Sequence, residues 1–258
     1  MCGRFIWGVK RPRHRNERFH FKISTNTMLQ LESINTFYGK AQIIFDLNLE
    51  ARAGEVTVLL GRNGAGKTTT FKSIMGLVKM VSGKTIFNHT RIEHLPPHRI
   101  CRSGLGYVPE DRRIFSRLSI MENLEVARQP SRKGLQPWTP ERLFELFPNL
   151  GEKPGQCGAN LSGGEQQMLT IARTLMGNPQ LVILDEPSEG LAPVILAELA
   201  KTVGKLKKEG VAVLMAEQNL KFAQTVGDRA YIIEQGRMRH ESAVSDLSRK
   251  TYEKYLSI

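Results

Sequence analysis

The chain has 258 residues, 40% of them hydrophobic, which is enough to bury the core of one large domain or of a domain with a small satellite. It has no run of 18 or more apolar residues, so it offers no candidate for a membrane-spanning helix. The three cysteines, Cys2, Cys101 and Cys157, are widely separated and form no C-x-x-C pair. We therefore expect a reducing compartment, unpaired thiols and no cysteine-based structural metal.

Half of the formal net charge of +12 lies at the N-terminus, because residues 1–27 hold seven Lys and Arg and a single acid, Glu17. A basic arm that touches nucleic acid or anionic lipid is one interpretation of this segment. We favour an extension without regular structure. Met28 directly begins an alternating strand pattern, so we hypothesise that the natural chain starts there. An intact mass of the native protein that begins at Met1 contradicts this hypothesis.

Short strands are predicted over residues 28–34, 43–49 and 56–60, where apolar and β-branched residues gather. Between the first two lies the segment Phe37-Tyr38-Gly39-Lys40, which we expect to form a turn with an exposed aromatic ring. Tyr38 precedes the glycine-rich segment described next by a little over twenty residues. It is therefore a candidate to stack on an adenine ring, although an ordinary packing residue is the alternative.

Residues 61–68, with the sequence GRNGAGKT, match the phosphate-binding pattern G-x-x-x-x-G-K-[ST]. The strand expected over 56–60 precedes the loop, and residues 69–75, closed by Gly76, predict a helix after it. This order of strand, loop and helix is the context in which the pattern binds phosphate. The residues that we assign to nucleotide binding here are Gly61, Arg62, Asn63, Gly64, Ala65, Gly66, Lys67, Thr68 and Thr69.

The chemistry of a phosphate site explains these residue types. The three glycines let the backbone turn tightly and bring its N–H groups against phosphate oxygens, and the positive end of the following helix points at the same place. Lys67 supplies an ammonium for the β- and γ-phosphates, and Thr68 offers a hydroxyl to Mg²⁺. A dinucleotide fingerprint is excluded, because Thr69 stands where it needs a glycine. The segment predicts a triphosphate site.

The middle of the chain changes from a mixed to a helical pattern. Residues 81–84 are expected to form a turn, 85–88 a strand, 97–103 a short helix and 104–109 a strand. From 110 to 160 the apolar spacing becomes helical, interrupted by a loop rich in Pro, Gly and basic residues between Pro130 and Pro140. We expect a helical insert between two parts of an α/β core.

A second glycine-rich loop, Leu161–Glu165, begins a helix that ends before Pro179. The apolar strand that follows ends in Asp185 and Glu186, which places two carboxylates at the crevice where open α/β sheets bind ligands. A helix near 193–208, a strand over 211–216 and a hairpin over 230–239 continue the α/β pattern.

Taken together, these motifs resemble the ATP-binding subunit of ABC transporters over about residues 28–258. Leu161–Glu165, with the sequence LSGGE, resembles the family signature and follows the glycine loop in the family's order. The resemblance implies an α/β fold, with a P-loop ATPase core, an antiparallel β subdomain and a helical subdomain at about 110–160. It also implies ATP and Mg²⁺ as ligands.

The resemblance assigns roles to the two carboxylates. Asp185 looks like the aspartate that holds Mg²⁺ through water, near Thr68; a strand-end carboxylate that caps the next turn is the alternative. Glu186 resembles the catalytic glutamate that orients and polarises the attacking water. Phosphoryl transfer asks little covalent chemistry of the protein, so such a site works by positioning and charge stabilisation.

The signature residues are expected to act in trans. In this family two ATPase domains sit head to tail, and the signature of one meets the γ-phosphate held by the other. Ser162 and the free N–H groups of the following helix end form an anion site there. A chain with one glycine loop and one signature therefore supplies only part of each shared ATP site, and a second ATPase subunit is required. The residues assigned to this shared site are Ser162, Gly163, Gly164 and Glu165.

Three positions depart from the family pattern. Glu110 stands where a glutamine is usual; it can still reach Mg²⁺ through water, but it cannot donate as an amide does. Gln218 stands where a histidine is usual, so it can donate to a γ-phosphate but cannot carry a proton. Ala192 replaces an aspartate. An inactive subunit is one explanation, but Lys67 and both carboxylates are intact, so we expect turnover.

Several runs resemble the second ATPase of branched-chain amino acid importers, with the urea importer's equivalent as the nearest alternative. These runs are Gly106–Phe115, Glu165–Met168, Ser188–Pro193 and Glu217–Asn219. The resemblance implies a location at the cytoplasmic face of the inner membrane, a sibling ATPase, two transmembrane permease subunits and an extracytoplasmic solute-binding protein. Contact with the permease is expected at the helical subdomain and the Glu110 loop.

Two rivals remain open. The basic charge favours a soluble ABC ATPase that acts on nucleic acid or ribosomes. Such proteins usually carry coiled coils, a zinc hook or tandem ATPase halves, and the sequence shows none of these. We expect no nucleic-acid partner; binding by the Met28-started chain that persists at 200 mM salt would revive this reading. A regulatory ATP binder without turnover is the other.

Overall fold

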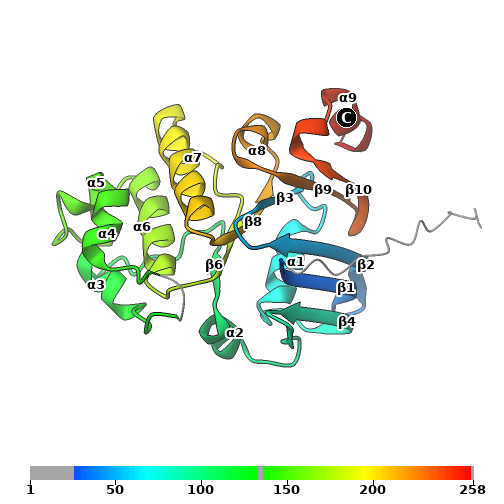
Figure 1. Cartoon of the computed structure of the whole chain (residues 1–258), viewed down its shortest axis with the longest axis horizontal. Helices are drawn as coiled ribbons and strands as arrows, with labels where there is room; N and C mark the ends of the chain where they lie inside the picture. Colours follow the sequence, from blue (N-terminus) through cyan, green and yellow to red (C-terminus); the bar gives the residue numbers. More distant parts are fainter. Residues whose placement is uncertain (1–25, 133–135, 257–258) are drawn as a thin grey trace, which may run out of the picture.

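The computed structural model describes residues 26–132 and 136–256, and the interpretations made for residues 1–25 lie outside them. No described helix is long and apolar enough to cross a membrane. Figure 1 shows two sheets beside a group of helices. The larger sheet has the strand order β10-β9-β3-β8-β7-β6. Its members are β3 (Val56–Leu60), β6 (Leu105–Val108), β7 (Leu181–Asp185), β8 (Ala212–Glu217), β9 (Arg229–Glu234) and β10 (Arg237–Ala243).

The strands of the larger sheet are parallel except β10, which pairs antiparallel with β9. β3, β7 and β8 are buried along their whole length, as expected of parallel strands covered on both faces. Successive side chains point to opposite faces. On β7, Val182 and Leu184 join one hydrophobic cluster while Leu181 and Ile183 join the other. The sheet therefore separates two cores.

The smaller sheet is antiparallel, with the order β2-β1-β4-β5. Its strands are β1 (Thr27–Tyr38), β2 (Ala41–Arg52), β4 (Met80–Phe87) and β5 (Thr90–Arg91). Apolar side chains of β1 and β2 pack with α1 (Lys67–Ile74) and α2 (Pro97–Ser103) against one face of the larger sheet. This confirms the predicted fold class, an α/β core with an antiparallel β region near the start.

The other core lies under the remaining helices. The helical region, residues 114–176, contains α3 (Ile120–Val126), α4 (Pro140–Leu146), α5 (Pro148–Gly151), the 3-10 turn η1 (Gly158–Asn160) and α6 (Gly163–Leu175). Figure 1 shows α3 to α6 grouped on one side of the sheets. α7 (Pro193–Lys208), α8 (Leu220–Val226), the 3-10 turn η2 (Val244–Asp246) and α9 (Arg249–Leu256) complete the chain.

The helix starts in the helical region follow their local sequence. Ser119 caps α3 with a reciprocal hydrogen bond to Glu122, a capping box. Thr139 accepts a hydrogen bond from the Arg142 N–H at the start of α4, whose first residue is Pro140. These local signals explain why short helices form where apolar spacing alone is brief.

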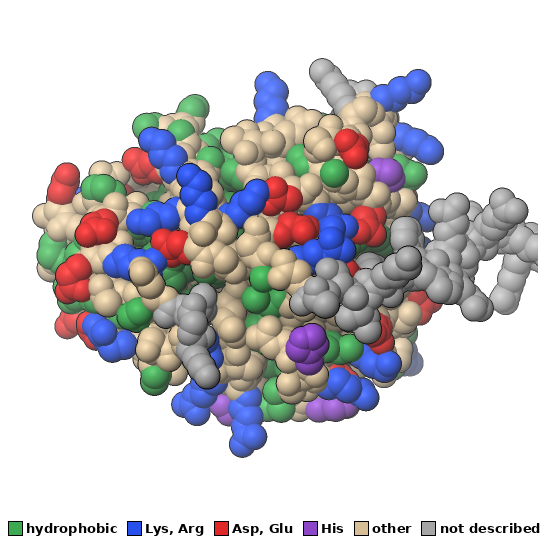
Figure 2. Space-filling view, viewed as in Figure 1, with side chains coloured by type: hydrophobic (Ala, Val, Ile, Leu, Met, Phe, Trp, Pro, Cys, Tyr) green, Lys and Arg blue, Asp and Glu red, His purple; other side chains and the backbone are tan. Residues whose placement is uncertain are grey.

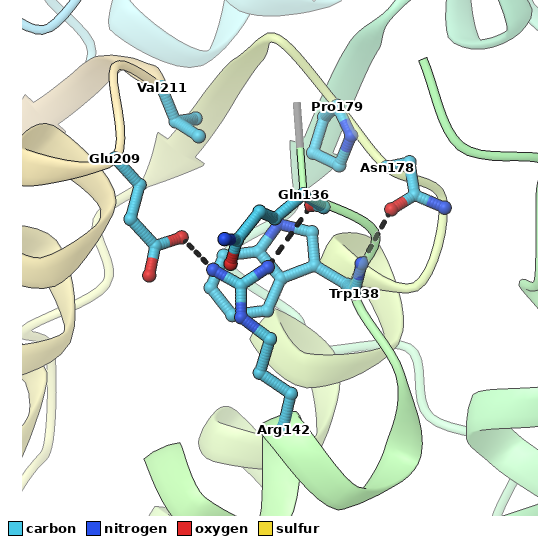
Figure 3. A pocket seen from close by; sticks show the side chains of 7 residues that line it. All are labelled: Gln136, Trp138, Arg142, Asn178, Pro179, Glu209 and Val211. Atoms are coloured by element: carbon cyan, nitrogen blue, oxygen red, sulfur yellow. Dashed lines mark hydrogen bonds and ion pairs between the residues drawn. The ribbon is translucent and has the colours of Figure 1, made fainter. Parts of the chain in front are cut away.

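Asn178 and Arg142 join the helical region to the rest of the molecule. The Asn178 side chain accepts from the Trp138 N–H at 2.7 Å and donates to the Gln129 carbonyl at 2.7 Å. Figure 3 shows the Arg142 guanidinium over the Trp138 ring, in an ion pair with Glu209 just after α7. A cavity of about 300 Å³ lies at this junction.

Two local predictions are wrong. Residues 81–84 do not form a turn, because β4 runs through them and pairs with β1. A Cβ on Gly83 would lie 2.6 Å from the Ile34 Cα, so this glycine marks a close approach of two strands. The predicted turn at residues 37–40 is shorter than expected, because β1 continues to Tyr38 and only Gly39 and Lys40 turn. α8 and α9 were not predicted.

Candidate active site

The glycine loop joins β3 to α1, as its sequence predicts. Gly64 and Gly66 have positive φ angles of 78° and 112°, which side-chain-bearing residues rarely adopt. A Cβ on Gly66 would also lie 2.8 Å from the Ile44 Cδ1 atom. Arg62, Asn63 and Gly64 are exposed, whereas Ala65 and Gly66 are buried. The loop is thus anchored at its base and presents its tip to solvent.

Lys67, the first residue of α1, is 3% exposed and is held by three oxygens. Its Nζ donates to the Gly61 carbonyl at 2.8 Å and to the Arg62 carbonyl at 3.0 Å. It also lies 3.0 Å from the Glu186 Oε1 atom, in a buried ion pair. A buried ammonium of this kind needs partners to offset its desolvation. Lys67 therefore links the glycine loop to the end of β7.

Asp185, the last residue of β7, lies against Thr68 and Tyr107. The Thr68 hydroxyl donates to one carboxylate oxygen at 3.0 Å, and the Tyr107 hydroxyl donates to the other at 2.9 Å. Burial raises the pKa of Asp185 to about 6, and the two hydrogen bonds only partly offset that effect. Sequence reasoning missed Tyr107, although its place on the neighbouring strand β6, beside Ile183, could have suggested it.

The Thr68–Asp185 pair fits a magnesium ion that arrives with a nucleotide. Mg²⁺ prefers oxygen ligands and is usually held by one or two protein oxygens together with phosphates and water. Thr68 and Asp185 offer a hydroxyl and a carboxylate side by side. Glu110 is exposed just after β6, and its charge contributes to the raised pKa of Asp185, so it lies in the same neighbourhood. It makes no hydrogen bond to Asp185.

Glu186 lies where the glycine loop, β7 and β8 meet. Its φ of 48° is unusual for a residue with a side chain. Gln218, just after β8, donates to the Glu186 Oε2 atom at 2.8 Å and to the Asn63 Oδ1 atom at 2.5 Å. Burial raises the pKa of Glu186, but the hydrogen bonds from Gln218 and Lys67 outweigh it and hold the pKa below its usual value. Glu186 is therefore kept ionised.

Glu217 is a third buried carboxylate of this site, after Asp185 and Glu186, and sequence reasoning missed its role. It is 2% exposed, and its oxygens accept from the Ser188 N–H at 3.2 Å and the Ser188 hydroxyl at 2.8 Å. Burial raises its pKa to about 7, and the hydrogen bonds from Ser188 and Asn219 offset only part of that effect. Glu217 thus ties the loop after Glu186 to the strand that carries Gln218. An acid ending an otherwise apolar strand was the available signal.

The signature residues lie elsewhere, at the start of α6 in the helical region. Ser162 and Glu165 form a capping box, and Glu165 also pairs with Lys153. Ser162 and Gly163 are exposed, and a Cβ on Gly163 would lie 2.7 Å from the Arg112 guanidinium. α6 belongs to one hydrophobic cluster and α1 to the other, on opposite faces of the larger sheet.

Tyr38 ends β1 and is 48% exposed. Its ring is thus accessible to a ligand, and adenine stacking stays a prediction. The assembled residues nonetheless define a class. A mostly parallel sheet with a glycine loop between β3 and α1, a buried lysine on that loop, and adjacent carboxylates at the end of β7 define a P-loop nucleotide-hydrolysing protein.

Comparison with known proteins gives the family. Residues 44–189 match the family described as "ABC transporter". The high-affinity branched-chain amino acid transport ATP-binding protein BraG of Pseudomonas aeruginosa is 41% identical over 211 residues, 82% of this chain and 91% of that protein. The lipopolysaccharide export system ATP-binding protein LptB of Haemophilus influenzae is 36% identical over 216 residues, 82% of this chain and 89% of that protein. The chain belongs to the ABC transporter family.

A solved structure agrees with this assignment. The ADP conformation of MJ1267, an ATP-binding cassette of an ABC transporter, has a TM-score of 0.76 and 25% identity, covering 91% of this chain and all of the other. The chain is therefore an ABC ATPase, a subunit of a transporter. The family and the ATPase activity predicted from the sequence are both confirmed. As in its relatives, ATP is the nucleotide that such a cassette binds.

Proposed function

We propose that the chain is the ATP-hydrolysing subunit of an importer for branched-chain amino acids. The observation that carries the solute is the 41% identity to BraG over 91% of that protein. A probable branched-chain amino acid transport ATP-binding protein, LivF of Archaeoglobus fulgidus, is 31% identical over 85% of this chain, which supports the same solute class. In this proposal no described residue contacts the solute, so the assignment of the solute rests on sequence similarity alone.

MgATP would bind at the glycine loop, where the N–H groups and the start of α1 receive the phosphates. Lys67 would bind the β- and γ-phosphates, and the exposed ring of Tyr38 would stack on the adenine. Thr68 and Asp185 would hold the Mg²⁺, Glu110 reaching it through water; the ion neutralises charge on the phosphates. The proximity of the Thr68 hydroxyl to Asp185 supports this assignment.

The Lys67–Glu186 ion pair suggests how binding and hydrolysis are linked. A triphosphate competes with Glu186 for the Lys67 ammonium, because both are anions at hydrogen-bond distance from Nζ. Once Lys67 turns to the phosphates, Glu186 is free to orient a water molecule. Gln218 lies against Glu186 and can donate to the γ-phosphate. Water positioning therefore follows substrate binding in this scheme.

A second ATPase subunit would complete the site. The exposed start of α6, with Ser162, Gly163 and Gly164, would meet the γ-phosphate held by the sibling's glycine loop. Glu165 supports this end, because its carboxylate is engaged in the capping box. Closure of the two subunits on ATP would drive the permease, and hydrolysis would release it.

The permease would dock on the helical region and the Glu110 loop, at the cytoplasmic face of the inner membrane. Phe115 and Val126 are large apolar side chains that remain 47% and 60% exposed there, which supports contact with a partner. Two transmembrane permease subunits and an extracytoplasmic solute-binding protein would complete the transporter. On the face shown in Figure 2, basic and acidic side chains are interspersed. A nucleic-acid-binding surface instead gathers Lys and Arg in one patch, so this face gives no support to nucleic-acid binding.

Two alternatives concern the cargo. The equivalent subunit of a urea or other amide importer is one, because its ATPase would present the same site. The 36% identity to LptB favours a lipopolysaccharide exporter as another. A soluble ABC ATPase outside transport is less favoured than either, because BraG and LptB are both transport proteins.

Purification of the native complex in mild detergent separates these possibilities. We expect the chain to bring down a different ATPase, two permeases and a binding protein, and we expect that binding protein to bind leucine, isoleucine or valine by calorimetry. Uptake of labelled leucine should be lost in cells whose only copy carries Glu186→Gln. A binding protein that takes urea, or a complex that contains lipopolysaccharide export components, would overturn the proposed solute.

A further inference from the structure

The C-terminal helix α9 follows a firmly attached segment. Leu247, just before it, is 3% exposed, and its carbonyl accepts from Gln224 on α8 at 3.4 Å. Ser248 caps the helix, because its hydroxyl accepts from the Thr251 N–H at 3.0 Å. These contacts fix where α9 begins. The first turn of the helix is therefore placed beside the loop that follows β8.

Tyr252, in that first turn, reaches the candidate active site. Its hydroxyl donates to the Gln218 carbonyl at 2.6 Å, across 34 residues of chain. Its ring is half-buried and packs against the larger hydrophobic cluster. A short hydrogen bond from a packed ring restrains the peptide that it contacts, because the ring itself has little freedom to follow.

Gln218 is restrained on either side along the chain, and the N–H of the peptide that follows it, which belongs to Asn219, donates to the Glu217 carboxylate at 3.3 Å. Glu217 before it is buried and held on Ser188, and the Asn219 side chain after it caps α8 by accepting from the Phe222 N–H. Between them, the Gln218 amide must reach both the Asn63 and Glu186 side chains. The only hydrogen bond to the Gln218 carbonyl among the described residues comes from Tyr252.

We propose that Tyr252 is a positioning residue for ATP hydrolysis, through which the C-terminal helix holds the Gln218 peptide so that the Gln218 side chain meets Glu186. This inference rests on the role proposed above for Gln218. Without the hydroxyl, the peptide after Gln218 keeps only the longer hydrogen bond from its N–H to Glu217, so it rotates more freely. The Gln218 side chain then leaves hydrogen-bond distance of Glu186 for part of the time. The γ-phosphate donor and the carboxylate that orients water are then less often aligned.

The variant Tyr252→Phe tests this, because it removes the hydroxyl and keeps the packed ring. ATP turnover is measured on the full-length chain in its native complex. We expect kcat to fall about 2- to 10-fold, which is the value of one neutral hydrogen bond, with the KM for MgATP unchanged. Tyr255→Phe is the matched control, because it removes a hydroxyl from the same helix that makes no hydrogen bond among the described residues; it should leave kcat unchanged.

A double-mutant cycle with Gln218→Ala separates this inference from the role of Gln218 itself. We expect Tyr252→Phe to lower kcat in the wild-type background and to have no further effect in Gln218→Ala. Equal losses in both backgrounds, an unchanged kcat in Tyr252→Phe, or a rise in KM alone would overturn the positioning role. If Gln218→Ala itself leaves kcat unchanged, the proposed function of Gln218 fails instead, and the inference fails with it. Equal melting temperatures exclude a loss of folding.

Discussion

The two regions of this chain that we propose face phosphate are built differently. The carboxyl edge of the larger sheet is connected internally, because Lys67, Asp185 and Glu186 are buried and each is bound by other side chains. The exposed start of α6, which we call the signature end, contains Ser162 and Gly163 and is ordered mainly by its own capping box. The residues at the sheet edge are thus held by one another, whereas the residues of the signature end are exposed to solvent.

This difference supports the proposal that one chain makes only part of a catalytic site. Buried charges need partners in the same chain, because an unpaired ion in a protein interior is costly. The N–H groups at an exposed helix end can hydrogen-bond to water, so they carry no desolvation penalty in the single subunit. In our proposal they exchange that water for the phosphate of the other subunit's ATP. Changes at the sheet edge should therefore alter the chemistry of this chain's ATP, and changes at the signature end should alter its partner's.

The largest effect is expected from Glu186→Gln at the sheet edge. Gln cannot act as an anion toward the attacking water, so hydrolysis should fall roughly 10²- to 10⁴-fold. The fluorescence of a labelled ATP should report binding that is largely intact, because the amide is similar in size and frees Lys67 from an ion pair. Glu32→Gln, at a surface ion pair on β1, is the control and should turn over normally. Undiminished hydrolysis in Glu186→Gln would refute the role.

The second prediction concerns the signature end. Gly163→Asp should abolish most hydrolysis, about 100-fold, because a carboxylate there repels the γ-phosphate of the sibling subunit by several kcal/mol. An acid in the first turn favours the helix, and the Arg112 guanidinium that the new Cβ would approach is the end of a flexible side chain that can shift, so folding should not suffer. Gly163→Asn, of the same shape without charge, is the matched variant and should lose much less. Equal losses in Asp and Asn would show that bulk, not phosphate, explains the effect.

The third prediction uses Glu217, whose pKa is raised by burial to about 7 from a reference of 4.5. The folded state binds this proton more tightly than the unfolded state, so the stability that it contributes is present below pH 4.5 and is lost as the pH rises through about 7. Glu217→Gln cannot ionise. Between pH 5 and pH 8 the variant should gain roughly 2 kcal/mol relative to wild type, measured by urea unfolding.

Parallel pH profiles of the two proteins would show that Glu217 is not the titrating group. Asp185 and Glu186 lie nearby but are present in both proteins, so their titration cancels in the difference. The comparison of wild type with Glu217→Gln therefore tests whether the sheet edge contains a buried group that ionises in this pH range.

The smallest effect is expected at the junction of the two regions. Arg142→Met keeps an unbranched side chain over Trp138 and removes the charge that pairs with Glu209. Both side chains are partly exposed, so the free energy of unfolding should fall by only about 1 kcal/mol. A drop of a few degrees in the melting temperature is the readout. Glu209→Gln should lose less, because Arg142 then keeps its hydrogen bonds to the Gln136 and Pro137 carbonyls. A double variant that loses no more than Arg142→Met alone would show that Glu209 acts through Arg142.

Much of the architecture was predictable because its signals are local. The strand before Gly61, the helix that begins at the Leu161–Glu165 loop and the acid pair at the end of β7 each depend on a few adjacent residues. The structure has these elements where the sequence predicts them. The turn predicted at residues 81–84 failed because Ser-Gly is also what two strands need when they approach closely. Local sequence does not distinguish the two cases.

By itself the sequence determined the fold class, the glycine loop and the family, because backbone turns, phosphate geometry and apolar periodicity leave patterns within short segments. Tertiary structure alone decided the partners of those residues. Tyr107 meets Asp185, Glu217 holds Ser188 and Tyr252 reaches Gln218 because strands and helices far apart in the chain pack side by side. Such contacts depend on how whole elements pack, and no run of adjacent residues encodes them.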